Sequence, residues 1–337
     1  TIAGLYDDAG EYLNSGLVVE LEQRLLAASP FTQKRQMGKV WVLNVDPKVY
    51  QAAVQGWLSE FHNIRVLTQA SITKPIVATS DHSTVKQVSI SRGDDELRLE
   101  THSVIDATGG AELVRRLDPS LVSSGSALAG WVVQLRGVTP GVFKFPFNVS
   151  VLNRIRKATK EGLLPEICST LWLDSGVQAD ELYGKFNLSE GQADTVDIAD
   201  VSTQLSAFLR NIPELADVTV ATVGTLGIRD KGQICGDYCL TESDVKNATP
   251  FNDSACQAAW PIEHWHSEKG IQLEYLPKGH RYSIPLRTLA VKGFRNLWVC
   301  GKSLSAEPRA QASARVVGTC WALGDALGKH LSKEALQ

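Results

Sequence analysis

A glycine turn followed by a helix start near the C-terminus forms the strongest candidate for ligand chemistry. Residues 296–331 read as a strand, a glycine turn, a loop and a helix. Gly301 has no Cβ, so the backbone at this turn can approach a ligand closely. The helix is expected to begin near Gln311–Arg315, where free N–H groups and the positive dipole end favour an anionic or electron-rich ligand. A helix packed on a sheet without a ligand explains the pattern equally well, so both interpretations stay open.

The run VIDATGG over residues 104–110 is a second candidate. It is an apolar strand that ends in a turn of small residues, and such a turn suits close approach of the backbone to a nucleotide. Many strands of α/β proteins end in glycine, so this run is informative only together with the first segment.

Apolar runs and turn residues predict the elements that position these segments. Asp46 and Pro47 open a helix, with Asp46 as N-cap and Pro47 in the first turn. The other helices are expected over 16–28, 149–161, 197–210 and 310–332. Strands are expected over 39–45, 63–68, 71–79, 85–91, 95–101, 103–107, 127–137, 170–174, 184–188, 217–228, 271–276 and 296–300.

The order of these elements predicts an α/β protein with an inserted antiparallel sheet that helices cover. Residues 296–300 form a continuous apolar strand, which is typical of a parallel sheet buried on both faces. We expect one domain to comprise residues 1–120 and 285–337, and an inserted domain to comprise residues 121–284.

Composition excludes several classes of protein. The 337 residues carry 34 basic and 37 acidic side chains, and 43% are hydrophobic, so a disordered chain and a nucleic-acid binder driven by phosphate contacts are not expected. No apolar run approaches the roughly 20 residues that a membrane helix needs. The six cysteines are spread along the chain and imply no disulfide framework. Cys235 and Cys239 lack a second close pair that would complete a metal site.

The cellular location rests on weak signals. Sequons of the type Asn-x-Ser/Thr arise often by chance, and here they start at Asn148, Asn187, Asn247 and Asn252. The chain begins at Thr1 and its single methionine is Met37, so a lost leader would be invisible. We expect a cytoplasmic protein, with secretion left open.

The two candidate segments together resemble the second and last flavin motifs of the two-dinucleotide-binding-domain flavoproteins, and more narrowly the FAD-dependent oxidoreductase family. Residues 227–265 are similar to that family's arginine-rich stretch, although Gly232 stands where its second arginine would be. Residues 282–297 resemble its Ile-Pro-Tyr-Arg region, with Leu286 in place of the aromatic residue. The four segments occur in the family's order, and the resemblance covers roughly residues 46–332.

The resemblance implies a Rossmann-like FAD-binding domain and FAD as the cofactor. Thr108 and Gly109 would line its nucleotide side, while Gly301 and Lys302 would meet the pyrophosphate or the ribityl chain. Ser305 completes the motif Gly-Lys-x-x-Ser. The backbone of Arg315 and Val316, at the start of the last helix, would stabilise negative charge on the N1–C2=O edge of the reduced flavin.

The implied activity is that of a dehydrogenase or oxidase that transfers a hydride from a small organic substrate to the flavin. Such an enzyme needs a base for the substrate's N–H or O–H proton, and the candidates are His280, Tyr282 and His264. Arg229 or Arg287 would hold a substrate carboxylate in bidentate fashion. A hydrogen-bonded structural role is the commoner one for a lone histidine. His264 and His266 have metal-like spacing without a third ligand, so no metal site is expected.

A glycine-rich Gly-x-Gly-x-x-Gly turn after a strand is absent from the sequence. In the family that βαβ unit is N-terminal and holds the ADP half of FAD. We therefore expect a unit on the order of 30 or more residues outside residues 1–337, either omitted from this sequence or carried by a second chain that completes the site.

Two alternatives remain. The first is a non-catalytic or electron-transfer subunit of a flavoprotein complex. The second is an N-terminal threonine hydrolase, because mature chains of that class begin with Thr, Ser or Cys. Against the hydrolase, the segment at Thr1 lacks a clear strand with a partner lysine, and the flavin-like motifs would go unexplained.

Overall fold

A computed structural model describes residues 1–77, 83–125, 129–188, 195–266 and 270–335. The chain forms two compact units, each treated by itself below. The first contains Thr1–Ser126, Asp230–Glu263 and Leu273–Gln337, and the second contains Ala127–Arg229 and His264–Gln272. Compared with the boundaries expected from sequence, the structure groups Asp230–Glu263 with the first unit. The role of the second unit as a substrate domain stays a prediction.

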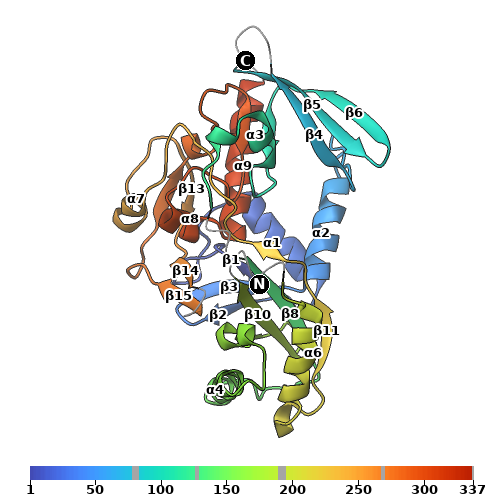
Figure 1. The fold of residues 1–337 in the computed structure, drawn as a ribbon. Helices are drawn as coiled ribbons and strands as arrows, with labels where there is room; N and C mark the ends of the chain where they lie inside the picture. Colours follow the sequence, from blue (N-terminus) through green and yellow to red (C-terminus); the bar gives the residue numbers. More distant parts are fainter. Residues whose placement is uncertain (78–82, 126–128, 189–194, 267–269, 336–337) are drawn as a thin grey trace. The chain divides into compact units, whose positions relative to one another are not determined.

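The first unit mixes helices with short strands (Figure 1). Its helices are α1 (Leu17–Ala28), α2 (Pro47–Ser59), α3 (Glu112–Leu117), α7 (Glu242–Asn247), α8 (Pro308–Ala314) and α9 (Val317–Glu334). Its strands are β1 (Ile2–Ala3), β2 (Gln33–Met37), β3 (Val40–Asn44), β4 (Ser71–Val77), β5 (Val85–Arg92), β6 (Asp95–Glu100), β7 (Val104–Asp106), β13 (Ser254–Ala258), β16 (Tyr282–Pro285) and β17 (Leu297–Val299). The chain passes between the units within the hairpin of β14 (Ile262–His266) and β15 (Gly270–Glu274).

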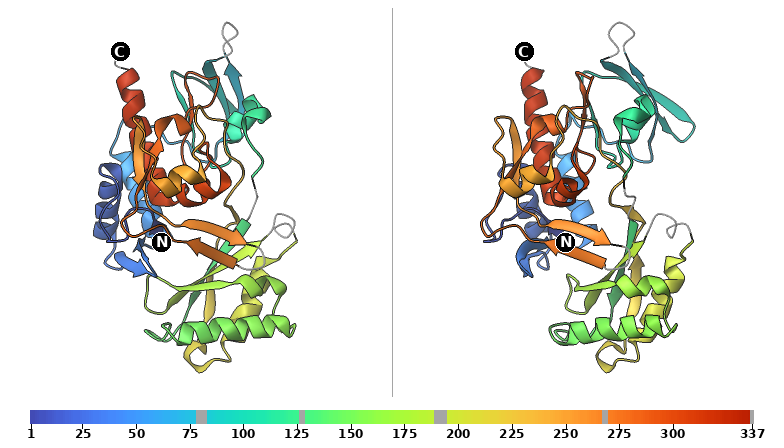
Figure 2. Two further views of the ribbon diagram at one scale, coloured as in Figure 1. Left: turned by 90° about the vertical axis from the view of Figure 1, so that its left-hand side faces the viewer. Right: turned by 60° about the vertical axis from the view of Figure 1, so that its left-hand side comes forward.

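The parallel pair β7–β17 positions both candidate segments. Val104 pairs with Leu297 and Asp106 with Val299, so the two strands end side by side. Beside them, β4, β5 and β6 form the antiparallel meander that the sequence predicts (Figure 2). The order β1–β3–β2 forms another antiparallel sheet, and β13 pairs with β16. The parallel arrangement at the end of the chain is therefore confirmed.

Helices α1, α2 and α9 share the largest hydrophobic core of the first unit. The rings of Trp57 and Trp321 stack with centroids 5.7 Å apart, and the Trp321 indole N–H donates to the Tyr50 hydroxyl. The Asp46 carboxylate accepts a hydrogen bond from the backbone N–H of Lys48, so the expected N-cap of α2 is confirmed.

The second unit is built around an antiparallel sheet in the order β11–β8–β10–β9, with β12 also paired to β8. Its strands are β8 (Ala129–Arg136), β9 (Trp172–Ser175), β10 (Glu181–Leu188), β11 (Thr219–Val223) and β12 (Gly227–Ile228). Helices α4 (Phe147–Lys160) and α6 (Ile198–Leu209) pack on one face of this sheet and close a single core around the fully buried Phe186. The inserted antiparallel sheet with covering helices is thus confirmed.

Three expectations about individual elements are wrong. The single strand expected over 217–228 is two strands, β11 and β12. Residues 63–68 form no strand, because Ile64 and Val66 are exposed and no neighbouring strand pairs with them. The single helix expected over 310–332 is two helices, and Arg315 and Val316 lie in the break between α8 and α9. Within the described residues, no helix combines the length and apolar character needed to cross a membrane.

Neighbouring valines of β8 provide a test of this core. Val133 is fully buried whereas Val132 is 40% exposed on the opposite face. We expect Val133→Ala to lower the unfolding free energy of the second unit by about 2 kcal/mol, through lost burial and a residual cavity. The matched change Val132→Ala should have an effect near zero. Urea unfolding followed by circular dichroism measures both, and equal effects would contradict the assigned faces of the sheet.

Candidate functional site

A cavity of about 520 Å³ lies at the carboxyl ends of β7 and β17, and we call it the cradle. Gly109 contributes to it from the turn after β7, and Gly301 and Lys302 contribute from the turn after β17. Arg315 and the first turns of α9 complete one wall, with Cys320 facing the cavity. Ligands of α/β proteins bind at this end of parallel strands, where loops and helix N-termini meet. The structure therefore brings the two candidate segments of the sequence into one site.

Backbone conformation explains the glycines of the cradle. Gly109 and Gly301 have φ angles of 73° and 97°, in the region that disfavours residues with a Cβ. A Cβ on Gly109 would also lie 2.7 Å from Cε of Lys302. The missing side chain therefore lets the aliphatic part of Lys302 cross the turn after β7.

Two cationic side chains of the cradle are partly buried. Burial lowers the pKa of Lys302, and the neighbouring charge of Arg315 lowers it further. Burial likewise lowers the pKa of Arg315, against the opposing attraction of Glu263 at 3.7 Å. Partly buried like charges destabilise one another, and an anion placed between them would offset that cost. The electrostatics of the cradle thus favour an anionic ligand.

The break between α8 and α9 exposes a helix start to the cradle. Arg315 is the C-cap of α8, Val316 is the N-cap of α9, and no side chain caps α9. The first N–H groups of a helix have no intrahelical acceptor, and they carry the positive end of its dipole. Burial raises the pKa of the Cys320 thiol to about 12, so this thiol adds no negative charge near neutral pH.

Asp106 organises the turn after β7 and was not among the residues singled out from the sequence. This buried carboxylate accepts hydrogen bonds from the Thr108 backbone and hydroxyl, and from the first-turn amides of Leu113 and Val114 in α3. Thr108 in turn accepts from the Glu112 amide and is exposed. An aspartate after an apolar strand and before a small-residue turn is the signal that could have identified it.

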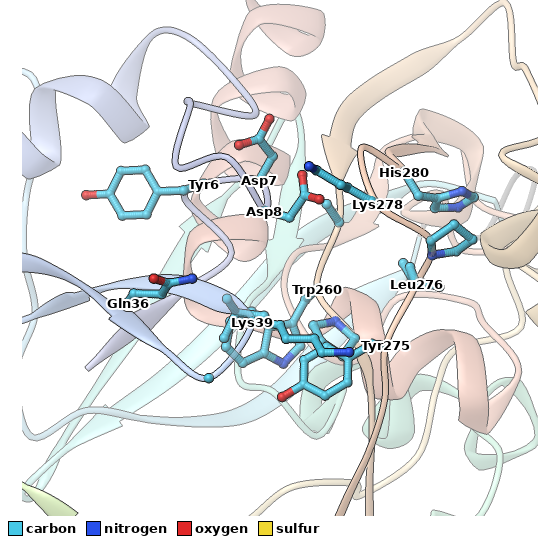
Figure 3. Close-up of a pocket in the computed structure, with 15 residues that line it drawn as sticks. Tyr6, Asp7, Asp8, Gln36, Lys39, Trp260, Tyr275, Leu276, Lys278 and His280 are labelled. Carbon is cyan, nitrogen blue, oxygen red and sulfur yellow. The ribbon is translucent and has the colours of Figure 1, made fainter. Parts of the chain in front are cut away.

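A second cavity of about 390 Å³ lies elsewhere in the first unit (Figure 3), and we call it the aromatic pocket. Its walls come from the segment at Tyr6–Asp8, the β2–β3 hairpin, residues 259–261 and the loop 275–280. Trp260 and Tyr275 supply aromatic surface, and Lys39 and His280 are among the polar groups. None of these segments is adjacent in sequence to the others, so only the fold brings them together.

One carboxylate connects the two cavities within the first unit. Glu263 accepts a hydrogen bond from the Trp260 indole N–H at 3.0 Å and lies 3.7 Å from the Arg315 guanidinium. Trp260 also packs in a small apolar cluster with Val40 and Val316. A wall of the aromatic pocket is therefore joined to the cation and the helix start of the cradle.

The predicted acid–base residues have different surroundings. His280 lines the aromatic pocket, and its Nε2 donates to the Val245 carbonyl at 2.7 Å, because a carbonyl oxygen only accepts. Tyr282 is fully buried; its hydroxyl bonds to Ser313, and Ser313 donates to the carbonyl of Trp260. His264 is exposed on β14, in the part of the chain assigned to the second unit. The structure does not group these three side chains within one described cavity.

The remaining predicted residues are engaged with protein groups. Arg287 pairs with Asp253, and its guanidinium lies 4.8 Å from the centroid of the Tyr238 ring. Arg229, in the second unit, donates to the Ala129 carbonyl. Ser305 is buried, and its backbone bridges Thr288 and Leu240. Among the described residues, no group of three His, Cys, Asp or Glu side chains could hold a metal ion.

Comparison with protein-family models decides the family. The model described as FAD dependent oxidoreductase matches residues 1–122 and 143–332. The chain belongs to the FAD-dependent oxidoreductase family. FAD is therefore its cofactor, and the fold is the Rossmann-like flavoprotein fold that the sequence predicts. A search of curated proteins finds no match.

Solved structures are similar to the chain only remotely. A geranylgeranyl bacteriochlorophyll reductase-like protein from Thermoplasma acidophilum shares 12% identity at a TM-score of 0.41, over 99% of this chain and 62% of that one. The p-nitrophenol 4-monooxygenase PnpA from Pseudomonas putida shares 10% identity at a TM-score of 0.39, over 97% of this chain and 60% of that one. Aklavinone-11 hydroxylase, solved with FAD and aklavinone, shares 11% identity at a TM-score of 0.38, over 95% of this chain and 46% of that one. The chain thus spans between 46% and 62% of the length of these proteins.

The donor set of the cradle fits FAD. Lys302, the Gly301 turn and the α9 start offer positive charge and backbone N–H groups, which suit a pyrophosphate and the carbonyl edge of a flavin. A side chain at Gly109 would collide with Lys302 and distort this arrangement. Of the residues that the family resemblance implies for the cofactor, Gly109, Gly301, Lys302 and Arg315 line the cradle, whereas Thr108, Ser305 and Val316 are not part of its lining. Their roles toward FAD stay predictions.

The burial of Lys302 is expected to lower the stability of the ligand-free protein and to favour the binding of FAD. Since its folded pKa lies below the ordinary value of 10.5, the charged side chain destabilises the ligand-free protein at neutral pH. This cost diminishes as pH rises from the folded pKa to 10.5. We expect Lys302→Met to raise the unfolding free energy of the ligand-free chain at neutral pH, to lose that gain at alkaline pH, and to abolish FAD retention.

Thermal unfolding across pH and FAD titration measure these effects. Lys48→Met on the exposed surface of α2 is the matched control and should change neither quantity. A Lys302→Met protein that is destabilised at neutral pH, or that retains FAD with unchanged affinity, would contradict the electrostatic account of the cradle.

Proposed function

We propose that the chain is an FAD-dependent oxidoreductase that transfers a hydride from a small organic substrate to the flavin, as a dehydrogenase or an oxidase. The observation that carries the proposal is the pair of partly buried cations beside an uncapped helix start, at the ends of two parallel strands. When bound, the flavin supplies a two-electron acceptor for the substrate's hydride.

The cradle residues hold and polarise the cofactor in this proposal. Lys302 and the Gly301 turn bind the pyrophosphate or ribityl chain, and the turn at Thr108 and Gly109, of which Gly109 lines the cradle, meets the nucleotide side. The amides at the start of α9 and the Arg315 guanidinium stabilise negative charge at the N1–C2=O edge. Ser305 supports the turn from within the protein, through its buried backbone hydrogen bonds.

His280 is the base that the surroundings favour. Donation of its Nε2 proton to the Val245 carbonyl leaves Nδ1 as the proton acceptor of a neutral imidazole. Burial raises the pKa of Tyr282, so its phenol stays protonated and positions Trp260 through Ser313. We retain His264 as a second candidate for proton transfer, and Arg229 and Arg287 as candidates for binding a substrate carboxylate.

The ADP half of FAD needs a glycine-rich βαβ unit, which we propose is supplied from outside residues 1–337, on the same polypeptide or on a second chain. Within the described residues β7 pairs with β17 alone, and Ile105 of β7 is 44% exposed. The remaining edge of β7 can therefore accept a further parallel strand. A cytoplasmic location remains our expectation for the assembled enzyme.

Flavin absorbance tests the proposed activity. The protein reconstituted with FAD, and with its βαβ unit if that is separate, should be yellow and should bleach when substrate is added without oxygen. A protein that binds FAD but bleaches only with a reduced protein partner would instead support the electron-transfer subunit. A colourless protein under these conditions would contradict both.

Substitution of His280 tests the proton-transfer step. We expect His280→Gln to keep the flavin spectrum and to lower kcat by about 100-fold or more, because the proton acceptor is lost. His62→Gln, at an exposed position after α2, is the matched control. If His280→Gln leaves kcat unchanged, His280 is not the base, and His264 becomes the candidate to test.

A further inference from the structure

The aromatic pocket differs in chemistry from the cradle and has the size of a small-molecule site. Its volume of about 390 Å³ falls within the range typical of ligand pockets. Trp260 forms a largely buried part of the wall, while Tyr275 is 38% exposed and presents its ring more openly (Figure 3). Pro261 and Leu276 add further apolar surface. A flat ring is the shape that such walls accept best.

Two lysines and two aspartates line the pocket, and Arg281 from outside the lining neutralises one of the aspartates. The Lys39 ammonium lies 5.2 Å from the centroid of the Tyr275 ring, and Lys278 makes no ion pair within the part of the chain that the structure describes. Of the two carboxylates, Asp7 pairs with Arg281, whereas Asp8 accepts a hydrogen bond from the Gly279 amide. The ammonium groups of Lys39 and Lys278 are therefore balanced within the lining by one further carboxylate, that of Asp8.

We propose that the aromatic pocket binds a planar aromatic carboxylate, with its ring against Trp260 and Tyr275 and its carboxylate directed to Lys39 and Lys278. This inference rests on the proposed function, because it takes the pocket as the substrate site beside the proposed base His280. The joining of Trp260 to Arg315 through Glu263 supports this use, since it ties a wall of the pocket to the cradle.

Each part of the proposed ligand has its own test molecule. Benzoate carries both the aromatic ring and the negative charge, whereas benzyl alcohol has the ring without a charge. Cyclohexanecarboxylate has the negative charge but no aromatic ring, and benzylamine has the ring with a positive charge. Equilibrium binding of each to the full chain can be followed by tryptophan fluorescence, which requires no turnover. We expect benzoate to bind about three- to tenfold more tightly than each of the others, given the size of exposed charge and ring contacts.

Variants assign the binding to the pocket. Lys39→Gln and Lys278→Gln should each weaken benzoate binding several-fold and leave benzyl alcohol unchanged, and Tyr275→Leu should weaken both. Lys48→Gln and Phe61→Leu, at exposed positions outside the pocket, are the matched controls and should have no effect. All five positions are exposed, so these variants are expected to fold, and circular dichroism verifies this.

The outcomes separate the two proposals. Benzoate binding that depends on the pocket lysines supports the inference even if the flavin never bleaches. Equal binding of benzoate and benzyl alcohol, tighter binding of benzylamine, or binding insensitive to both lysines would overturn it. A protein whose flavin bleaches with another substrate while benzoate fails to bind would refute the aromatic carboxylate and leave the oxidoreductase proposal intact.

Discussion

The site depends on two cations that the fold holds partly out of water, Lys302 and Arg315. Burial and the neighbouring charge of Arg315 lower the pKa of Lys302, and burial lowers the pKa of Arg315 although the carboxylates of Glu263 and Asp230 oppose that shift. The surrounding backbone holds both cations in place. The turn after β17 positions Lys302, and Gly109, which has no side chain, leaves room for the Lys302 side chain. The break before α9 positions Arg315. Such an arrangement lowers the stability of the empty protein and raises its affinity for an anionic cofactor.

Local signals in the sequence predicted much of the fold. Asp46 before Pro47 identified the start of α2, and the short apolar run at 296–300 identified a parallel strand, because burial on both faces removes the alternation of polar residues. The sequence analysis missed the break between α8 and α9. Residues 311–320 contain no proline, which favours one helix, yet the break coincides with Val316, Val317 and Gly318, which are weak helix formers.

The site was predictable where a contiguous motif carries it, and less so where contacts join distant segments. Gly301, Lys302 and Arg315 follow from one stretch of sequence, and the structure places all three on the cradle. Arg287 has the right chemistry for a carboxylate, yet the fold pairs it with Asp253. The aromatic pocket was missed, because Lys39, Trp260 and Tyr275 share no sequence pattern and meet only through tertiary structure.

Glu263 gives the first unit a means of making its two cavities interdependent. Its carboxylate faces the Arg315 guanidinium on the cradle side and receives the Trp260 N–H on the pocket side. The contact with Arg315 is made by Oε1 and the hydrogen bond from Trp260 is accepted by Oε2, so the two cavities share one carboxylate through its two oxygens. A carboxylate held between a cation and an indole N–H fixes the orientation of both partners, because each interaction limits where the other partner can lie.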